Sequence, residues 1–115
     1  MEENNKTKII TVNENDFEEK VINQSSSSLV VVDFWAEWCM PCQILGPIIE
    51  QAVSESSANV ILAKLNVDEN SQISQLYQIN AIPIVKFFKD GKVVDEFVGV
   101  LPIAQISEYI ARHTR

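Results

Sequence analysis

The spacing of hydrophobic residues along the chain predicts alternating strands and helices. Residues 29–35 form a β-branched run that is apolar except at Asp33, and residues 60–67 alternate apolar with polar positions, so both segments predict central strands. Residues 42–56 carry apolar side chains on one helical face, which predicts a helix that Pro47 should kink. The other predicted elements are strands at 8–12, 84–88 and 93–98 and helices at 16–23, 71–77 and 102–111.

Local signals mark several boundaries between these elements. Asn15 followed by Glu18 has the spacing of a capping box and is expected to start the first helix. The serine run at 25–28 is expected to be a connecting loop. The dipeptide Asp90-Gly91 predicts a two-residue hairpin turn between the last two strands.

The resulting order of elements is β-α-β-α-β-α-β-β-α, which defines an α/β protein. Strands that alternate with helices are expected to pair in parallel, and the last two strands form an antiparallel hairpin. We therefore predict one mixed central sheet with helices on both faces. Residues 7–115 are expected to form this single domain, and residues 1–6 are expected to be a flexible tail.

Composition and charge exclude several classes of function. The chain has 115 residues, enough for one domain, and its formal charge of −7 argues against a basic surface for nucleic acid. The longest apolar run, 29–32, is too short to cross a membrane, and the N-terminus lacks the pattern of a secretory signal. We therefore expect a cytoplasmic monomer with no nucleic-acid or membrane partner.

The sequence contains two cysteines, Cys39 and Cys42. Two are too few for a disulfide scaffold, and with His113 as the single histidine the chain lacks four ligands for structural zinc, so no metal is predicted. A zinc site shared between two chains stays open, as does a local structural disulfide, although so short a loop would stabilise the fold little. The remaining interpretation is a reversible dithiol–disulfide pair.

The position of the cysteine pair favours this redox interpretation. The pair follows a buried strand and begins a helix, where free backbone amides and the helix dipole stabilise a thiolate. Cys39 is nearer the loop and is expected to be the exposed nucleophile. Cys42 lies inside the first turn and is expected to be more buried and to attack second, which resolves a mixed disulfide within the molecule.

The segment 32–42, Val-Asp-Phe-Trp-Ala-Glu-Trp-Cys-Met-Pro-Cys, resembles the active-site signature of the thioredoxin family. Further matches in the family's order are Pro47, 63–68, 82–83, 88–92 and 98–99, and together they extend over residues 8–112. The resemblance implies a thioredoxin fold and a reductase that acts on disulfide-containing partner proteins. It also implies electrons from NADPH through a flavin-containing thioredoxin reductase. The chain itself is expected to bind no cofactor, because it lacks a Gly-rich dinucleotide fingerprint.

The resemblance also implies roles for residues around the pair. Asp33 would move protons for Cys42, with Lys64 nearby as its partner. A buried, unpaired carboxyl group should have a raised pKa, although a structural acid at a strand end is the alternative. Pro83 would form a cis peptide bond beside the cysteines, and the backbone of Ile82 would pair with an extended substrate segment. The expected substrate-binding residues are Trp38, Met40, Pro41, Ile82, Pro83 and Gly99, the last either keeping the groove open or satisfying strand-end geometry.

Three positions depart from the family's usual residues. Met40 replaces a glycine, Gln43 replaces a lysine and Ile84 replaces a threonine. Pro41 is retained, and in the family it accompanies reducing rather than oxidising proteins. The departures leave two alternatives open. One is an oxidase or isomerase whose redox poise Met40 alters, and the other is a binding module that uses its apolar rim for docking.

Overall fold

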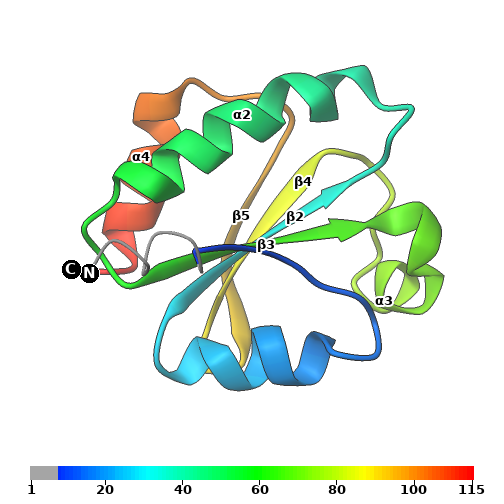
Figure 1. Ribbon diagram of the computed structural model, residues 1–115, viewed down its shortest axis with the longest axis horizontal. Coiled ribbons are helices and arrows are strands. Elements are labelled where there is room, and N and C mark those ends of the chain that lie inside the picture. Colours follow the sequence, from blue (N-terminus) through cyan, green and yellow to red (C-terminus); the bar gives the residue numbers. More distant parts are fainter. Residues whose placement is uncertain (1–7) are drawn as a thin grey trace.

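A computed structural model describes residues 8–115, which form a five-stranded sheet with helices on both faces (Figure 1). The strand order across the sheet is β1-β3-β2-β4-β5. The strands are β1 (Ile9–Thr11), β2 (Leu29–Trp35), β3 (Val60–Asn66), β4 (Ile84–Lys89) and β5 (Lys92–Val98). The tail predicted at 1–6 lies outside the described residues.

The sheet combines parallel and antiparallel pairs. Strand β3 runs parallel to both β1 and β2, whereas β4 runs antiparallel to β2 and to β5. The mixed sheet predicted from the order of elements is therefore confirmed. The hairpin between β4 and β5 turns at Asp90 and Gly91, whose φ angles are 53° and 80°. Two positive φ angles in a two-residue turn match the twist of the flanking strands, and Asp-Gly favours them.

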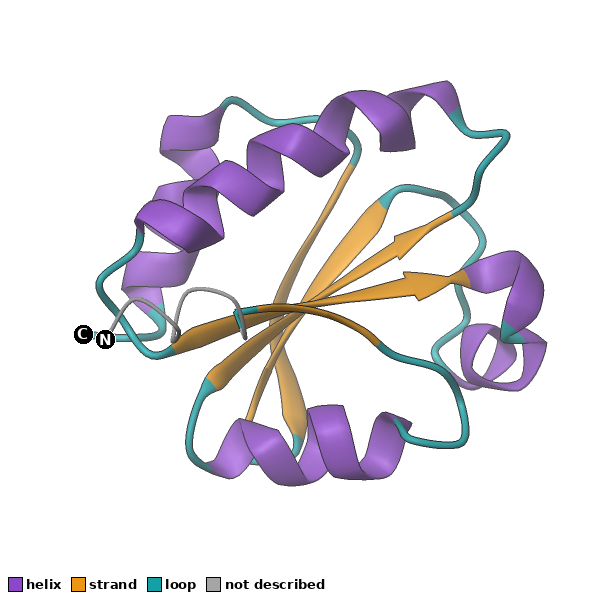
Figure 2. Cartoon of the chain, in the orientation of Figure 1, coloured by secondary structure: helices purple, strands orange, loops and turns teal. Residues whose placement is uncertain are grey.

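The helices form one layer on each side of the sheet (Figure 2). The α2 side holds α2 (Met40–Glu55) and α4 (Ile103–Arg112), and the opposite side holds the π-helical turn η1 (Glu18–Asn23) and α3 (Ser71–Leu76). Side chains of β2 alternate between the two cores, with Val31 on the α2 side and Val30 on the opposite side. The next residue on the α2 side is Asp33, so a carboxyl group enters the core beneath α2.

Helix α2 begins two residues earlier than predicted and has Cys39 as its N-cap. It continues through Pro47, where the missing amide N–H leaves the carbonyl of Gln43 without its usual helical donor. The helices within residues 8–115 are all too short or too polar to cross a membrane.

The predicted capping box at the first helix is wrong. Phe17 is the N-cap of η1, and no side chain of the described residues caps it. Asp16 Oδ1 instead accepts a 2.8 Å hydrogen bond from Asn13 N, one turn earlier. The carboxylate of Asp16 thus stabilises the entry to the helix in place of the Asn15–Glu18 pair.

The serine run is only partly the connecting loop that its composition predicts, because Ser27 and Ser28 lie outside helices and strands whereas Ser25 and Ser26 do not. Its first part belongs to a short 3-10 turn, η2 (Gln24–Ser26). The hydroxyl groups of Ser25 and Ser26 donate to the backbone carbonyls of Ile22 and Asn23, at 2.7 and 2.9 Å. Serine side chains that bond to carbonyls three residues earlier allow the helical path to continue past η1.

Candidate redox site

The two cysteines lie at the junction between β2 and α2. Cys39 has an extended backbone as the N-cap of α2, and Pro41 lies in the first turn. Cys39 and Cys42 form a disulfide, with their Cα atoms 5.3 Å apart. Cys39 Sγ accepts a hydrogen bond from Cys42 N at 3.2 Å. The strand-to-helix placement agrees with the prediction, and it directs a backbone amide of the first turn at a sulfur atom.

Both cysteines of the disulfide are buried. Each is 4% exposed, and with Ala36 they form a small cluster packed against Val67 and Ile82. The expectation of an exposed Cys39 beside a more buried Cys42 is therefore wrong for this disulfide form. The reason is that the bond to Cys42 holds Cys39 Sγ against the first turn of α2. The side chains next to Cys39 in the chain are far more exposed than the two sulfur-bearing residues.

Two of these neighbours are large, apolar and exposed. Trp38 is 71% exposed and Met40 is 69% exposed, one on each side of Cys39 in the chain. The indole N–H of Trp38 donates a 2.8 Å hydrogen bond to Asp68 Oδ2. Because this hydrogen bond restricts the rotation of the ring, the exposed apolar surface of the ring can contact a bound molecule with little loss of conformational entropy.

The loop before β4 packs beside the pair. The Ile82–Pro83 peptide bond is cis, as the resemblance implies, and Pro83 O accepts a 2.9 Å hydrogen bond from Gly99 N. Gly99 has a φ angle of 87°, and a Cβ added there would meet none of the described atoms within 4 Å. Glycine is therefore favoured at this position by the backbone conformation at the end of β5 and not by lack of room.

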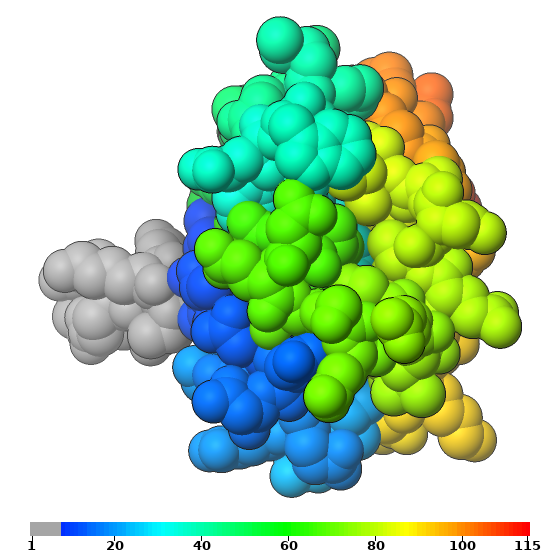
Figure 3. All heavy atoms as spheres, turned by 90° about the vertical axis from the view of Figure 1, so that its right-hand side faces the viewer, coloured from blue at the N-terminus to red at the C-terminus, as the bar shows by residue number. Residues whose placement is uncertain are grey.

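A pocket of about 370 Å³ opens beside the cysteine pair. It is lined by Trp38, Val67, Ile79, Asn80, Ala81 and Ile82. Figure 3 shows this side of the molecule, where the cyan start of α2 lies beside the green segment that contains the short turn η3 (Val67–Glu69). The pocket is mostly apolar, which suits the side chain of a bound polypeptide segment.

Asp33 is a buried carboxyl group on the α2 side of β2. It is 1% exposed, and within residues 8–115 its Oδ1 atom has no hydrogen-bond partner. Burial raises the pKa of Asp33 from an ordinary value of 3.8 to about 6; the charge of Lys64 opposes this rise and that of Glu50 adds to it. The carboxyl group therefore changes its charge close to neutral pH.

Lys64 stands directly opposite Asp33 in the pairing of β2 with β3. Its ammonium group, however, forms an ion pair with Glu50, with 2.7 Å between Nζ and Oε2. It also lies 5.9 Å from the centre of the Trp35 ring. Lys64 thus lies beside Asp33, as the resemblance implies, but its ammonium group forms an ion pair with the carboxylate of Glu50 and not with that of Asp33.

Glu50 is the charged residue of this site that the sequence predictions missed. It lies on α2 eight positions after Cys42, with Gly46 midway between them. Residues spaced four apart share one face of a helix, so this spacing was a signal that could have found it. The spacing alone does not show that Lys64, on a strand, reaches the same face.

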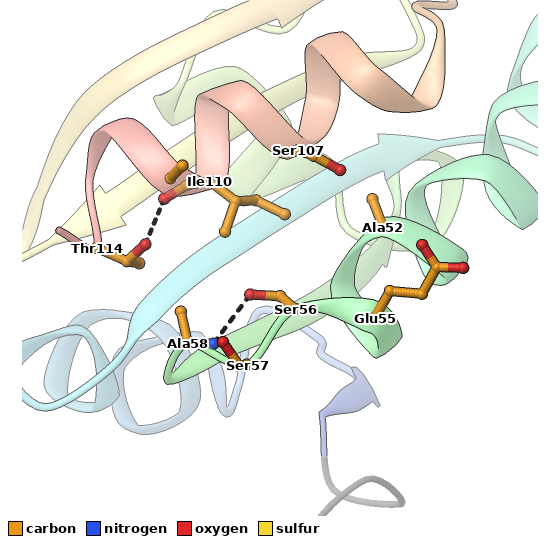
Figure 4. A pocket seen from close by; sticks show the side chains of 9 residues that line it. Ala52, Glu55, Ser56, Ser57, Ala58, Ser107, Ile110 and Thr114 are labelled. Atoms are coloured by element: carbon orange, nitrogen blue, oxygen red, sulfur yellow. Dashed lines mark hydrogen bonds between the residues drawn. The ribbon is translucent and has the colours of Figure 1, made fainter.

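The cavity shown in Figure 4 lies at the opposite end of α2, between that helix and α4, and has a volume of about 350 Å³. Two of its hydroxyl groups bond to the backbone: Thr114 Oγ1 donates to Ile110 O at 2.8 Å, and Ser56 Oγ accepts from Ala58 N at 3.1 Å. Glu55 is its one charged lining residue. These side chains offer no group for redox chemistry.

His113 lies at the end of α4, in another part of the molecule from the cysteines. Its Nε2 atom lies 2.9 Å from Asp95 Oδ2. In the part of the chain that the structure describes, no three His, Cys, Asp or Glu side chains gather as metal ligands would.

A disulfide at the start of a helix, beside a cis-proline loop and a buried carboxyl group, defines a site for thiol–disulfide exchange. The family model of thioredoxin matches residues 8–112. A thioredoxin of Chlorobaculum thiosulfatiphilum is 50% identical over 88 residues, which cover 76% of this chain and 82% of that protein. Thioredoxin 2 of Chlorobaculum tepidum is 41% identical over 106 residues, which cover 92% of this chain and 95% of that protein.

A solved structure is similar over nearly the same length. A mutant thioredoxin from Halobacterium salinarum matches with a TM-score of 0.82 at 27% identity, covering 95% of this chain and 93% of the other. The chain therefore belongs to the thioredoxin family, and it is a thiol–disulfide oxidoreductase that acts on protein disulfides. The thioredoxin fold and the redox function predicted from the sequence are confirmed.

Proposed function

We propose that the net reaction of this protein is the reduction of disulfides in partner proteins. The Cys39 thiolate attacks one sulfur of a partner disulfide, which forms a mixed disulfide, breaks the partner's S–S bond and releases the other partner sulfur as a thiolate that takes up a proton from water. Cys42 then loses its proton and attacks Cys39 Sγ, which releases the second partner thiol. Two electrons have then passed to the partner, and Cys39 and Cys42 are joined in a disulfide.

The observation that carries this proposal is the contact between Cys42 N and Cys39 Sγ at the N-cap of α2. An amide N–H directed at a sulfur, at the positive end of a helix, favours a thiolate over a thiol. In the reduced protein, Cys39 Sγ can accept this hydrogen bond and Cys42 Sγ cannot, because Cys42 itself supplies the amide N–H. This asymmetry supports the proposal that Cys39 attacks the partner and Cys42 resolves the mixed disulfide.

Asp33 is proposed to accept the proton that Cys42 loses. Its burial on the α2 side of β2 and its pKa of about 6 support this role, because a base works best when its pKa lies near the working pH. Lys64, its neighbour on β3, is proposed to set the charge state of Asp33 through its positive field.

The surface proposed to dock the partner consists of Trp38, Met40, Pro41, Ile82, Pro83 and Gly99. The exposure of Trp38 and Met40 supports this proposal. An extended segment of the partner is proposed to pair with the backbone of Ile82, as a strand added to an edge. The retained Pro41 supports the reducing direction.

The oxidised pair is proposed to regain its electrons from NADPH through a flavin-containing thioredoxin reductase. Family membership supports this route, and the three glycines of the sequence form no dinucleotide fingerprint, so the chain itself is proposed to bind no cofactor. We further propose one domain over residues 7–115, acting as a monomer in the cytoplasm. Its charge of −7 supports protein partners over nucleic acid.

Reduction of insulin disulfides by NADPH and thioredoxin reductase tests this function. Wild-type protein should turn over, and Cys39→Ser should show no turnover above the background of the reductase alone. Cys42→Ser should start the reaction but accumulate a mixed disulfide through Cys39, visible by mass spectrometry.

A matched control moves the thiol instead of only removing it. In Cys39→Ser/Ser54→Cys the chain keeps two cysteines, but one lies at an exposed position of α2 away from its first turn. This variant should stay inactive. Turnover in either variant that lacks Cys39 would contradict the proposed mechanism.

A further inference from the structure

Two carboxyl groups lie close to one lysine on the α2 side of the sheet. Asp33 and Lys64 are paired residues on neighbouring strands, so their side chains leave the sheet on the same face. Glu50 approaches the same lysine from α2 and takes the ion pair, at 2.7 Å. Asp33 Oδ1 is left without a hydrogen-bond partner among residues 8–115. The lysine is thus bound to the acid that lies on the helix rather than to its neighbour in the sheet.

The geometry of α2 explains why Glu50 reaches this lysine. Cys42, Gly46 and Glu50 follow one another at intervals of four residues along one face of the helix. A Cβ added at Gly46 would lie 3.7 Å from Lys64 Nζ, so this face of α2 passes directly over the ammonium group. A larger side chain at residue 46 would compete for the space through which Lys64 extends toward Glu50.

Exposure separates the two acids. The side chain of Glu50 is 39% exposed and that of Lys64 is 25% exposed, whereas Asp33 is 1% exposed. The ion pair between Lys64 and Glu50 is therefore nearer to solvent than the carboxyl group of Asp33.

We infer that Glu50 is a positioning residue that holds the Lys64 ammonium group away from Asp33 and so leaves the Asp33 carboxyl group without an ion partner. This inference deepens the proposed function, because it rests on Asp33 as the proton acceptor of Cys42. An acceptor paired tightly with a lysine would stay ionised and would be a poorer base.

The charges that face Asp33 come from two elements. Lys64 faces it from β3 and Glu50 from α2, and the other acid of α2, Glu55, lies at the exposed end of that helix. On β4 its paired residue is the apolar Val85. A change at Glu50 thus alters one of the two charges that act on Asp33, and alters the position of the other.

The first test is the pKa of Asp33 in the oxidised protein, measured by carbon-13 NMR of its carboxyl group. In Glu50→Gln, Lys64 is free to turn toward Asp33, and the pKa should fall by about one pH unit. Glu55→Gln is the matched control, because it removes the same charge from the exposed end of α2, and it should leave the value unchanged. An unchanged value in Glu50→Gln would overturn the inference.

A second pair of variants separates positioning from the direct repulsion between Glu50 and Asp33. Glu50→Gln is introduced into Lys64→Met, where no ammonium group can move. If Glu50 acts through Lys64, the fall caused by Glu50→Gln should shrink to less than half of its size in the wild-type background. A fall of equal size in both backgrounds would mean that Glu50 acts on Asp33 by its own charge, which contradicts positioning.

The pH profile of insulin reduction then separates this inference from the proposed function. If Asp33 accepts the proton of Cys42, the rise of the rate with pH should move to lower pH in Glu50→Gln by the same amount as the pKa. Glu50→Asp, which keeps the carboxylate, should restore part of the wild-type profile. A changed pKa with an unchanged rate profile would support positioning by Glu50 and would contradict proton transfer by Asp33.

Discussion

The two faces of the central sheet treat a buried charged residue in different ways. On the α2 side, Asp33 is 1% exposed and its Oδ1 atom has no partner within residues 8–115. On the opposite side, Lys86 is 9% exposed, and its Nζ atom forms a 2.6 Å ion pair with Glu96 Oε1 on the neighbouring strand. The two residues are thus similar in burial, and they differ in whether the fold supplies a counter-charge.

The presence or absence of a counter-charge determines whether each buried residue contributes to the stability of the fold. Lys86 and Glu96 face each other across β4 and β5, so the sheet itself provides the pairing. Asp33 likewise lies opposite Lys64, across the parallel pair of β2 and β3, but Lys64 forms its ion pair with Glu50. A buried carboxyl group without a partner is costly in its ionised form, and this cost is what brings its pKa close to neutral.

The largest expected effect is on the stability of Asp33→Asn. The folded pKa of about 6 lies above the ordinary value of 3.8, so ionisation of Asp33 opposes folding once the pH rises through this range. The neutral amide avoids this, and the free energy of unfolding at pH 8 should rise by about 3 kcal/mol. The carboxyl group becomes protonated in both states as the pH falls below the ordinary value of 3.8, and the gain should vanish there.

Denaturant unfolding of the oxidised protein at several pH values between 4 and 8 measures this effect. The gain should grow between the two pKa values and then level off. A gain of the same size at both ends of this range would show that packing, and not ionisation, separates the amide from the carboxyl group.

A smaller effect of opposite sign is expected for Lys86→Met. Removal of the ammonium group leaves Glu96, whose side chain is 49% exposed and is therefore still hydrated. The free energy of unfolding should fall by about 1 kcal/mol, since the remaining carboxylate is not trapped in the core. Urea unfolding at pH 7 checks this, and the rate of insulin reduction should stay within twofold of the wild-type rate. A loss of turnover would contradict the division between the two faces.

The smallest effect is expected at Asp95, a partly buried acid that has partners. Burial alone would raise its pKa, but hydrogen bonds from His113, the backbone of Glu96 and Arg112 lower the pKa of Asp95 overall. Asp95→Asn should therefore lose stability at neutral pH, by less than about 1 kcal/mol. The loss should fade as the pH falls through the depressed pKa, because the wild-type carboxylate becomes protonated there.

Unfolding curves of Asp95→Asn and Asp33→Asn, measured under the same conditions, compare an acid that has partners with a buried acid that has none among residues 8–115. The two variants make the same chemical change, and their effects at pH 7 should have opposite signs. Effects of the same sign would show that the presence of partners does not decide how a carboxyl group contributes to stability in this fold.

Much of the fold was predictable because its signals are local. The largely apolar run at 29–35 and the amphipathic pattern after Cys42 predicted β2 and α2, and Asp90-Gly91 predicted the turn between β4 and β5. The failures were local as well. Asp16, and not the predicted capping box, accepts a hydrogen bond at the entry to the first helix. The hydroxyl group of Ser25 donates to a carbonyl of the preceding turn, and the residue composition of the serine run does not reveal this bond.

The kind of chemistry could be predicted from the sequence, because a CxxC pair between a strand and a helix start specifies both the reactive sulfur atoms and the electrostatic field around them. The burial of Cys39 and the ion pair of Lys64 with Glu50, instead of with Asp33, depend on how the elements pack in the folded protein. Asp33, Glu50 and Lys64 come from three different elements, and the spacing of residues along a chain does not show which side chains meet when those elements pack. The free energy of an ionised group depends on those contacts, so the proton chemistry of Asp33 is a property of the folded protein.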